Sequence, residues 1–377
     1  MAEFFGVSDS CAYVEARDTA AALPEQADVV IIGGGPGGLA CAKALARGGA
    51  RVLLVERKAS FGRKVCAGGI TASGMLGNLP QGLIERAFPV QHLCSPRQRI
   101  RVEEQQPIVA TVNRERLGGW MAQQAREAGA LLCCGVHALN LTDRGVLLRD
   151  AAGRVRECSC EHLVGADGAR SLVRRALGLS SCLSIGLNAM LPIERLQRPE
   201  MEWHLDPRLF ASGYGWIFPH AGLCSVGAFS DSRLMSAKTL QHNLQFWAAR
   251  QGIDLKTTPM QAGWVNYDFQ GLHFGRTWLV GDAAGLSSAL TGEGIYPAVC
   301  SGEAVAAMIL ASYSENERPD PNELSALIKR HAQHRRLAAL AGRGRILPLV
   351  LAELFLLLLR LHAVDFRRLE MAVAQDG

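Results

Sequence analysis

The sequence predicts an α/β protein in which a Rossmann-like dinucleotide-binding domain is interleaved with a mostly antiparallel domain and followed by a helical tail. Three observations carry this prediction. A strand, glycine turn, helix and strand follow one another from Ala27, the strand-and-glycine pattern returns at residues 163–174 and 278–285, and short aromatic-rich strands separate these last two. Hydrophobic residues make up 49% of the 377-residue chain, which is enough apolar material for two cores.

The chain divides into segments that we expect to alternate between these domains. The first 26 residues form a lead without a pattern, and residues 316–322 (NERPDPN) form a linker. The dinucleotide-binding domain is predicted from residues 27–90, 108–175 and 265–315, the second domain from residues 91–107 and 176–264, and the helical tail from residues 316–377.

Composition and charge exclude several other classes of protein. Lys and Arg number 40 against 35 Asp and Glu, an excess of 5 that does not indicate a nucleic-acid partner. The 11 cysteines contain no C-x-x-C spacing and the 10 histidines are scattered, so no metal site is predicted and a reducing, cytoplasmic compartment is favoured. The N-terminus lacks a secretory pattern, and no stretch reaches the roughly 18 apolar residues of a membrane span.

The first strand–helix–strand unit has the order of a βαβ fold. ADVVIIG (residues 27–33) is typical of a buried strand, GGGPGG (33–38) of a tight turn, LACAKALARGG (39–49) of a helix and ARVLLVE (50–56) of a second buried strand. Their crossover is expected to be right-handed.

The glycine turn carries the G-x-G-x-x-G spacing of a dinucleotide site. Gly33 permits the turn, Gly35 lets the backbone approach a pyrophosphate, and Gly38 allows helix and strand to pack closely. Glu56 ends the second strand, where a carboxylate accepts hydrogen bonds from ribose hydroxyls and favours FAD or NAD over a 2′-phosphate. The alternative is a glycine-rich turn that binds no ligand; it explains the glycines but not the position of Glu56 at the end of the second strand.

Two later segments place an aspartate after a buried strand. LVGADGARSLVR (163–174) matches D-G-x-x-S-x-x-R at Asp167, and WLVGDAAG (278–285) places Asp282 before TGEGIYPAV (291–299). Each aspartate is expected to fix a hydroxyl or an N–H group, while the glycines free backbone amides for phosphate or flavin oxygens. Taken alone, either aspartate is equally well explained as a helix cap.

With these residues in place, the chain resembles the FAD-dependent oxidoreductases of the para-hydroxybenzoate hydroxylase fold, and among them the geranylgeranyl reductases. The resemblance covers roughly residues 27–310. Its specific segments are RKVCAGGIT (63–71), VNRERLGGWMAQQAREAGA (112–130), YGWIFP (214–219) and GDAAGLSSALTGEGIY (281–296). The chain departs from the family pattern at Ala67, Gly118 and Ala289, where Gly, Asp and Pro are common.

The resemblance implies FAD as the cofactor and assigns residues to it. Arg114 would reach the FAD phosphates, Asp282 the pyrophosphate or ribityl chain, and Val136 the adenine. Arg63 and Lys64 would begin the loop that passes the flavin. The complete set implied is Gly33, Gly35, Pro36, Gly37, Gly38, Glu56, Arg57, Arg63, Lys64, Ala67, Arg114, Val136, Ala166, Asp167, Gly168, Gly281, Asp282, Gly292, Gly294 and Ile295, the last three beneath the flavin ring.

The resemblance also implies reduction of carbon–carbon double bonds in an isoprenoid or similar lipid-like substrate. Cys66 is a candidate proton donor or gate, and Tyr214 and Trp216 are candidate walls for a greasy chain; the alternatives are a buried small hydrophobe and sheet-core aromatics. Since no second G-x-G-x-x-G occurs, the flavin is expected to be reduced by transient NAD(P)H or a protein donor. The alternative functions are a flavin monooxygenase or halogenase of an aromatic or natural product, and a non-catalytic, flavin-bound interaction or electron-carrier protein.

The tail combines a basic stretch with an apolar one. Residues 329–345 hold six Lys or Arg and no acid, and residues 346–359 are apolar except for Glu353. Fourteen residues are too few to span a bilayer. Residues 329–360 are therefore expected either to anchor the protein at an anionic membrane surface or to pack as an internal or interface helix.

Overall fold

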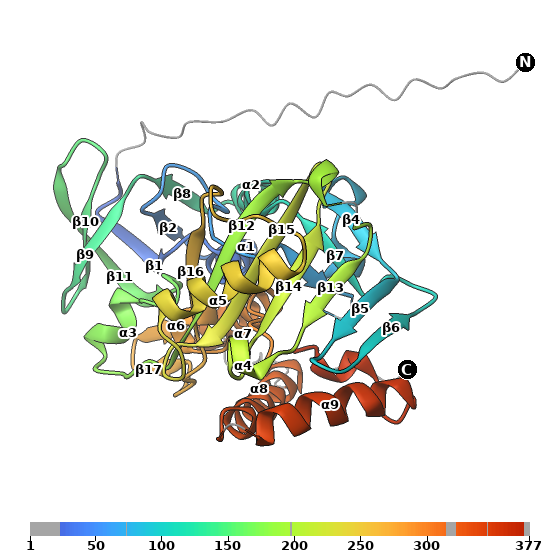
Figure 1. Cartoon of the computed structure of the whole chain (residues 1–377). Coiled ribbons are helices and arrows are strands. Elements are labelled where there is room, and N and C mark those ends of the chain that lie inside the picture. The colour runs from blue at the N-terminus through green and yellow to red at the C-terminus, as the bar shows by residue number, and fades with distance from the viewer. Residues whose placement is uncertain (1–22, 73, 197, 314–321, 345, 373–377) are drawn as a thin grey trace, which may run out of the picture.

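The computed structural model describes residues 23–372 except 73, 197, 314–321 and 345. Nearly all of the predicted lead and linker lies outside the described residues. The described chain forms an eight-stranded, a seven-stranded and a three-stranded sheet, with the tail helices along one side of the molecule (Figure 1). The α/β fold class is confirmed.

The eight-stranded sheet has a parallel centre. Its strand order is β17-β18-β11-β1-β2-β8, and β10 and β9 continue from β11. β1 pairs in parallel with β2 and β11, β2 with β8, and β11 with β18. The bounds are β1 Gln26–Ile32, β2 Val52–Glu56, β8 Leu131–Cys134, β9 His137–Leu141, β10 Gly145–Arg149, β11 Val155–Gly165, β17 His273–Phe274 and β18 Thr277–Leu279.

Because the central strands are parallel, their carboxyl ends meet at one edge, where the glycine turn, Glu56 and both aspartate motifs follow. The helices of this domain are α1 Pro36–Arg47, α2 Arg114–Glu127, α3 Leu172–Ala176, α6 Gly281–Ala284 and α7 Ile295–Ser312. We call these elements the parallel-sheet domain.

Helix α7 differs from the sequence prediction that no stretch is long and apolar enough to span a membrane. It is long and apolar enough to cross a membrane by composition. Eight of its residues are nevertheless buried, and a Cβ on Gly302 would lie 2.3 Å from the carbonyl oxygen of Gly37 in α1. The close approach of these two glycines marks α7 as a core helix of the parallel-sheet domain.

The seven-stranded sheet is antiparallel except for the β13–β5 pair. Its order is β16-β12-β15-β14-β13-β5-β6, and α4 and α5 pack on it. The bounds are β5 Val90–Cys94, β6 Arg99–Glu103, β12 Leu183–Pro192, β13 Met201–His204, β14 Tyr214–Pro219, β15 Leu223–Asp231, β16 Gln261–Asn266, α4 Pro207–Phe210 and α5 Ala237–Arg250. We call this the antiparallel-sheet domain.

A small third sheet, which the sequence pattern did not predict, joins the two domains. Its order is β3-β7-β4, with β3 Gly69–Thr71, β4 Ile84–Phe88 and β7 Val109–Val112. Short 3-10 turns occur at Leu76–Asn78, Gln81–Leu83, Ile193–Arg195 and Phe366–Leu369.

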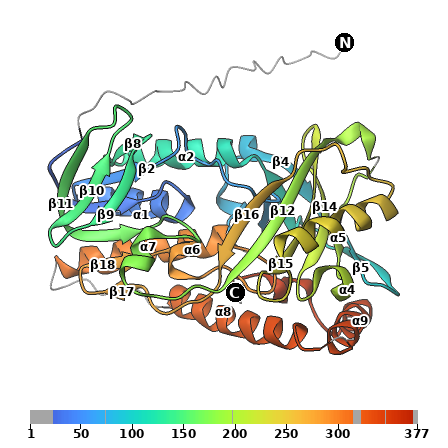
Figure 2. The same ribbon diagram turned by 60° about the vertical axis from the view of Figure 1, so that its left-hand side comes forward.

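The tail forms two helices, α8 Asn322–Ala341 and α9 Leu347–Arg360 (Figures 1 and 2). Helix α8 packs on the parallel-sheet domain: the buried His334 places Nδ1 2.8 Å from Ser288 Oγ, and burial lowers the pKa of His334 to about 4. Helix α9 lies against the antiparallel-sheet domain, where Leu356 and Leu359 join the core. The buried side of the tail therefore packs internally.

Candidate functional site

A single cavity of about 1220 Å³ runs between the two domains and the tail. It is lined by every candidate residue predicted from the sequence except Gly38. The structure therefore brings together residues that are up to 262 positions apart, from Gly33 to Ile295.

The glycines of the turn have different environments. Gly33 has φ +111° and a Cβ there would lie 2.3 Å from the Ala166 carbonyl oxygen, while a Cβ on Gly38 would lie 2.1 Å from the Gly33 carbonyl oxygen. A Cβ on Gly35 meets nothing within 4 Å. Gly33 and Gly38 therefore serve backbone packing, and Gly35 leaves open space in the cavity at the N-terminus of α1, which has no side-chain cap.

Glu56 is oriented by one backbone group of the glycine turn and one of the loop that follows β2. Its Oε2 accepts from Gly34 N at 2.8 Å and its Oε1 from Lys58 N at 2.9 Å. Each carboxylate oxygen has a further lone pair, so the side chain can still accept from a ligand in the cavity. The strand end thus presents a fixed acceptor, as a dinucleotide ribose requires.

Arg114 supplies the test of whether an anionic cofactor fits. It begins α2 and lines the cavity, and its Nε and Nη1 are buried without a hydrogen-bond partner among the described residues. Buried guanidinium donors that lack a partner are costly, and a phosphate satisfies such donors well. Together with the open space at Gly35, this fits a dinucleotide pyrophosphate.

The two aspartates have protein partners. Asp167 Oδ2 accepts from Leu172 N at 2.6 Å, so this oxygen caps α3, whereas Oδ1 has no partner among the described residues. Burial raises the pKa of Asp167 despite its hydrogen bonds. Asp282 Oδ2 pairs with Lys64 Nζ at 2.5 Å, which links the loop after β2 to the segment before α7. A role as helix cap therefore explains one oxygen of the Asp167 carboxylate, Oδ2, and leaves Oδ1 unexplained.

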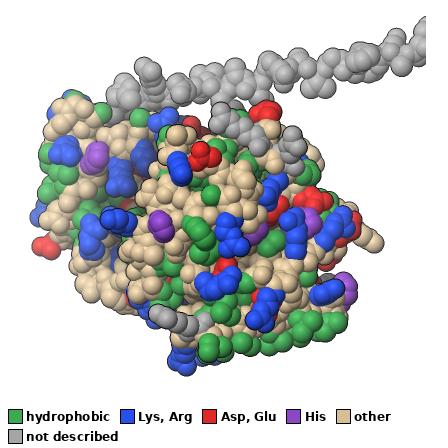
Figure 3. Space-filling view, in the orientation of Figure 1, with side chains coloured by type: hydrophobic (Ala, Val, Ile, Leu, Met, Phe, Trp, Pro, Cys, Tyr) green, Lys and Arg blue, Asp and Glu red, His purple; other side chains and the backbone are tan. Residues whose placement is uncertain are grey.

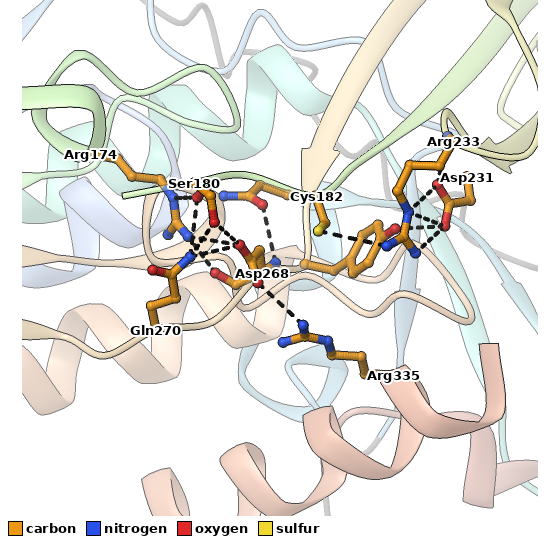
Figure 4. A network of polar contacts seen from close by, with 10 residues as sticks. Arg174, Ser180, Cys182, Asp231, Arg233, Asp268, Gln270 and Arg335 are labelled. Atoms are coloured by element: carbon orange, nitrogen blue, oxygen red, sulfur yellow. Dashed lines mark hydrogen bonds and ion pairs between the residues drawn. The ribbon is translucent and has the colours of Figure 1, made fainter. Parts of the chain in front are cut away.

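The arginine of the D-G-x-x-S-x-x-R motif acts inside the protein. Arg174 is 1% exposed, and it donates to the carbonyl oxygens of Ala283 at 3.0 Å, Asp268 at 2.5 Å and Ser180 at 2.6 Å. Asp268 in turn pairs with Arg335 of α8 at 3.4 Å (Figure 4). Arg174 therefore holds α3 and α6 together, and the same network reaches the tail.

The aromatic residues at the other end of the cavity form a continuous wall. Trp203 lies 4.6 Å from Phe218 and 5.3 Å from Tyr214 between ring centroids. Tyr214 donates to the Thr291 carbonyl oxygen at 2.6 Å, and Trp216 Nε1 donates to Ser225 Oγ at 2.8 Å. The polar groups of Tyr214 and Trp216 are therefore hydrogen-bonded within the protein, and their apolar rings line the cavity. The members of this aromatic wall are Trp203, Tyr214, Trp216, Phe218 and Phe229.

Cys66 lies in the loop before β3 and is partly buried beside the cavity. Its Sγ accepts from Gly68 N at 3.4 Å. The side chain is therefore oriented by its own loop and remains accessible from the cavity.

Sequence reasoning missed the part that the tail plays in the cavity. Residues 364–372, which we call the C-terminal strap, run from Phe366 beside Trp203 to Met371 in the core of the parallel-sheet domain. Apolar side chains of α9 complete the same wall. The tail residues on the cavity are Leu337, Ala341, Pro348, Leu351, Ala352, Leu354, Phe355, Leu358, Val364, Phe366, Arg368, Leu369 and Glu370. The apolar run at 346–359 was the available signal.

Glu293 was also missed, although it lies within the GEGI segment. Its Oε1 accepts from Thr71 Oγ1 at 3.1 Å and its Oε2 from Met371 N at 2.9 Å. Burial raises the pKa of Glu293 from 4.5 to about 7, and these two hydrogen bonds oppose the shift. The carboxyl therefore connects β3 to the strap and carries a proton in part of the population at neutral pH.

We expect Glu293→Gln to change how stability depends on pH. The folded protein holds the Glu293 proton above the pH at which the unfolded chain releases it, so the stability that this group contributes declines from pH 4.5 and is lost above about 7. The shift corresponds to about 3 kcal/mol. In urea unfolding experiments, the free energy of unfolding of the wild type should fall by about 3 kcal/mol relative to that of Glu293→Gln as the pH is raised from 4.5 to 8. Glu115 is exposed, and the unfolding free energy of the control Glu115→Gln should change with pH as that of the wild type does. If the difference in unfolding free energy between Glu293→Gln and the wild type stays constant with pH, the raised pKa of Glu293 is contradicted.

A second buried cluster brings Cys94, Glu202 and His204 within 4.8 Å of one another. Glu202 Oε2 already pairs with Arg198 at 2.9 Å and with His204 at 3.0 Å, and Arg99 lies 3.4 Å from Oε1. Two guanidinium groups at this carboxylate oppose a bound cation. The cluster is an ion-pair network of the antiparallel-sheet domain.

Comparisons with known proteins agree with this architecture. Residues 26–190 match the family model of the FAD binding domain. Digeranylgeranylglycerophospholipid reductase 2 of Methanothermobacter thermautotrophicus is 31% identical over 325 residues, which cover 79% of this chain and 81% of that protein. Geranylgeranyl diphosphate reductase of Rhodobacter capsulatus is 27% identical over 78% of this chain and 77% of its own length.

Among solved structures, a geranylgeranyl bacteriochlorophyll reductase-like protein of Thermoplasma acidophilum has the same fold. The TM-score is 0.72 at 22% identity, covering 87% of this chain and 96% of that one. The myxobacterial chondrochloren halogenase superposes with a TM-score of 0.62 at 19% identity, over 78% and 77% of the two chains.

Proposed function

This chain belongs to the geranylgeranyl reductase family of FAD-dependent oxidoreductases, and we propose that it reduces carbon–carbon double bonds in the isoprenoid chain of a lipid-like substrate. The observation that carries the proposal is the continuity of the cavity. It runs from the glycine turn and Arg114 at one end to the aromatic wall and α9 at the other. A polar cofactor end and a long apolar arm suit FAD and a prenyl chain.

The chain's own residues would hold FAD along the edge of the parallel sheet. The free N–H groups at the start of α1 and the Arg114 guanidinium would face the pyrophosphate, and Glu56 the ribose. Gly292 has φ +69° and the Tyr214 hydroxyl holds the neighbouring Thr291 carbonyl, so this backbone segment is fixed on the cavity, where it would face the flavin. When bound, reduced flavin supplies a hydride, and NAD(P)H or a protein donor would restore it.

The remaining chemistry falls to the protein. Addition of a hydride to one alkene carbon must be matched by a proton on the other, and Cys66 is the proposed donor of that proton. The aromatic wall and the apolar side chains of α9 exclude water and hold the chain extended beside the cofactor. None of the five residues of the aromatic wall is charged, so we place the prenyl chain there rather than an anionic headgroup.

The test uses dithionite-reduced holoenzyme and two probes, geranylgeranyl diphosphate and a digeranylgeranylglycerophospholipid. We expect a product heavier by two hydrogens for each reduced double bond, together with flavin reoxidation under anaerobic conditions. Flavin reoxidation by neither probe would count against reduction of an isoprenoid. Substrate-stimulated oxygen consumption with NAD(P)H would point to a monooxygenase or halogenase instead.

We further propose that the protein docks on membranes through the outer face of α9. Leu347, Val350, Leu354, Leu357 and Leu361 recur at three- and four-residue intervals and all are exposed, with Leu354 at the border between this outer face and the cavity. They form a continuous apolar strip along the lower edge of the molecule, with Lys or Arg side chains beside it (Figure 3). Such a strip suits the headgroup boundary of an anionic bilayer.

Replacing the strip with acids should weaken this docking. Val350 is 53% exposed and Leu357 42%, and neither lines the cavity, whereas Leu356 is fully buried and is left intact. Losing about 1.5–3 kcal/mol of burial at each position should lower binding of Val350→Asp/Leu357→Asp to phosphatidylglycerol vesicles at least tenfold. Binding of the wild type should fall with salt.

Val155→Asp is the matched control, because Val155 is also 53% exposed but lies on β11 of the parallel-sheet domain. It should bind vesicles as the wild type does, and thermal unfolding should show that all three proteins fold. Absence of wild-type binding at low salt would contradict membrane docking.

A further inference from the structure

A buried histidine–glutamate pair lies directly behind the Cys66 loop. His220 follows the last residue of β14, and its side chain is 8% exposed. Its Nδ1 lies 2.6 Å from Glu85 Oε2 on β4, and its Nε2 lies 3.0 Å from the carbonyl oxygen of Ala67, the residue after Cys66. One ring therefore connects the strand of the aromatic wall, the small third sheet and the cysteine loop.

Both partners of the ring are hydrogen-bond acceptors. A carboxylate and a carbonyl each require an N–H donor, so the protonated imidazole, which donates from both nitrogens, satisfies both contacts at once. The Glu85 carboxylate balances the charge of that form. The pair is thus arranged to hold the ring in one orientation, with Nε2 directed at the loop.

Packing and backbone contacts leave the loop little freedom around this ring. A Cβ on Gly68, which has φ +82°, would lie 2.5 Å from His220 Cε1. Val112 N donates to the Gly68 carbonyl oxygen at 3.0 Å, and Thr111 Oγ1 donates to the Pro219 carbonyl oxygen at 2.9 Å. The end of β14 and the cysteine loop are therefore both attached to β7.

We infer that His220 is a positioning residue, which acts through the Ala67 carbonyl to hold the Cys66 thiol at a fixed place relative to the aromatic wall. The inference rests on the proposed function in taking Cys66 and the wall as two sides of one reduction site. A proton donor displaced by about 1 Å can cost 100-fold in rate, so a fixed loop matters to such a site. His220 does not line the cavity, and its two imidazole nitrogens face Glu85 and Ala67.

The test compares thiol reactivity with turnover. In FAD-loaded protein, mass spectrometry follows alkylation of Cys66 by iodoacetamide, with the partly buried Cys182 outside the cavity as the internal reference. We expect the Cys66-to-Cys182 rate ratio to rise at least fivefold in His220→Ala. His220→Gln, which keeps a donor for the Ala67 carbonyl, should return the ratio to within twofold of wild type.

Turnover gives the second readout. With a prenyl lipid that the wild type reduces, kcat of His220→Ala should fall ten- to hundredfold while KM changes less than threefold. His92→Ala is the matched control, because His92 pairs with Glu200 in the same domain but lies away from the cavity; it should leave both readouts unchanged. If His220→Ala does not fold, Glu85→Gln should raise the thiol ratio at least twofold, because it withdraws the charge that holds the ring.

The outcomes separate this inference from the proposed function. An unchanged Cys66-to-Cys182 ratio in the folded His220 and Glu85 variants would overturn the positioning role, whatever the substrate. A raised ratio in a protein that reduces no prenyl lipid would support the positioning role and reject the proposed function.

Discussion

Gly35→Val should yield a folded protein that binds no FAD. The wild type should purify yellow, with one non-covalent FAD per chain, and the variant should remain colourless after incubation with excess FAD. The reason is the open space at this position: a Cβ on Gly35 meets no protein atom within 4 Å, so the valine side chain would occupy the part of the cavity proposed for the pyrophosphate.

Two other glycines make this prediction specific. Gly77 is equally open but lies outside the cavity, so Gly77→Val should keep its flavin spectrum. A Cβ on Gly38 would lie 2.1 Å from the Gly33 carbonyl oxygen, so Gly38→Val should lose the fold as well as the cofactor. Circular dichroism distinguishes the two kinds of failure. A yellow Gly35→Val protein would contradict the location of FAD proposed above.

Cys66→Ser should slow reduction of a prenyl substrate by roughly 100-fold or more, the usual contribution of a general acid. The serine hydroxyl can still accept from Gly68 N, so the loop keeps its hydrogen bond while the acidic thiol is lost. Single-turnover oxidation of prereduced enzyme by the alkene measures this step. Reduction of the flavin by dithionite should be unchanged.

Cys182→Ser controls for the general effect of replacing a partly buried cysteine. It should change stability by roughly 1 kcal/mol or less and leave the single-turnover rate intact. An unchanged rate in Cys66→Ser would remove this thiol from the mechanism and leave it a packing residue of the loop.

The parallel-sheet domain could be predicted from the sequence because its signals are local. The buried strand, the glycine turn and the following helix lie within 22 residues, and β1 and α1 begin and end close to the predicted positions. The spacing of Gly33, Gly35 and Gly38 also predicted three distinct roles. The structure adds that Gly33 and Gly35 both line the cavity, but that of the three glycines only Gly35 leaves open space where a side chain would stand, which spacing alone does not reveal.

The residues that sequence reasoning missed depend on contacts between distant parts of the chain. Glu293 meets the backbone of Met371, 78 residues later, and His220 meets Ala67, 153 residues earlier. No local pattern reports such pairs. Helix α9 was ambiguous for another reason, because it is apolar on all sides: Leu356 is buried and Leu357 is 42% exposed, although both have the same composition signal.

The C-terminal strap has a consequence for how the protein is made. Phe366 completes the wall beside Trp203, and Met371 is buried in a core that begins with β1. During synthesis on a ribosome, the first strands emerge long before these residues do. The part of the cavity lined by the aromatic wall therefore closes only when the end of the described chain has been translated. A nascent or prematurely terminated chain would expose the apolar side chains of this part to chaperones.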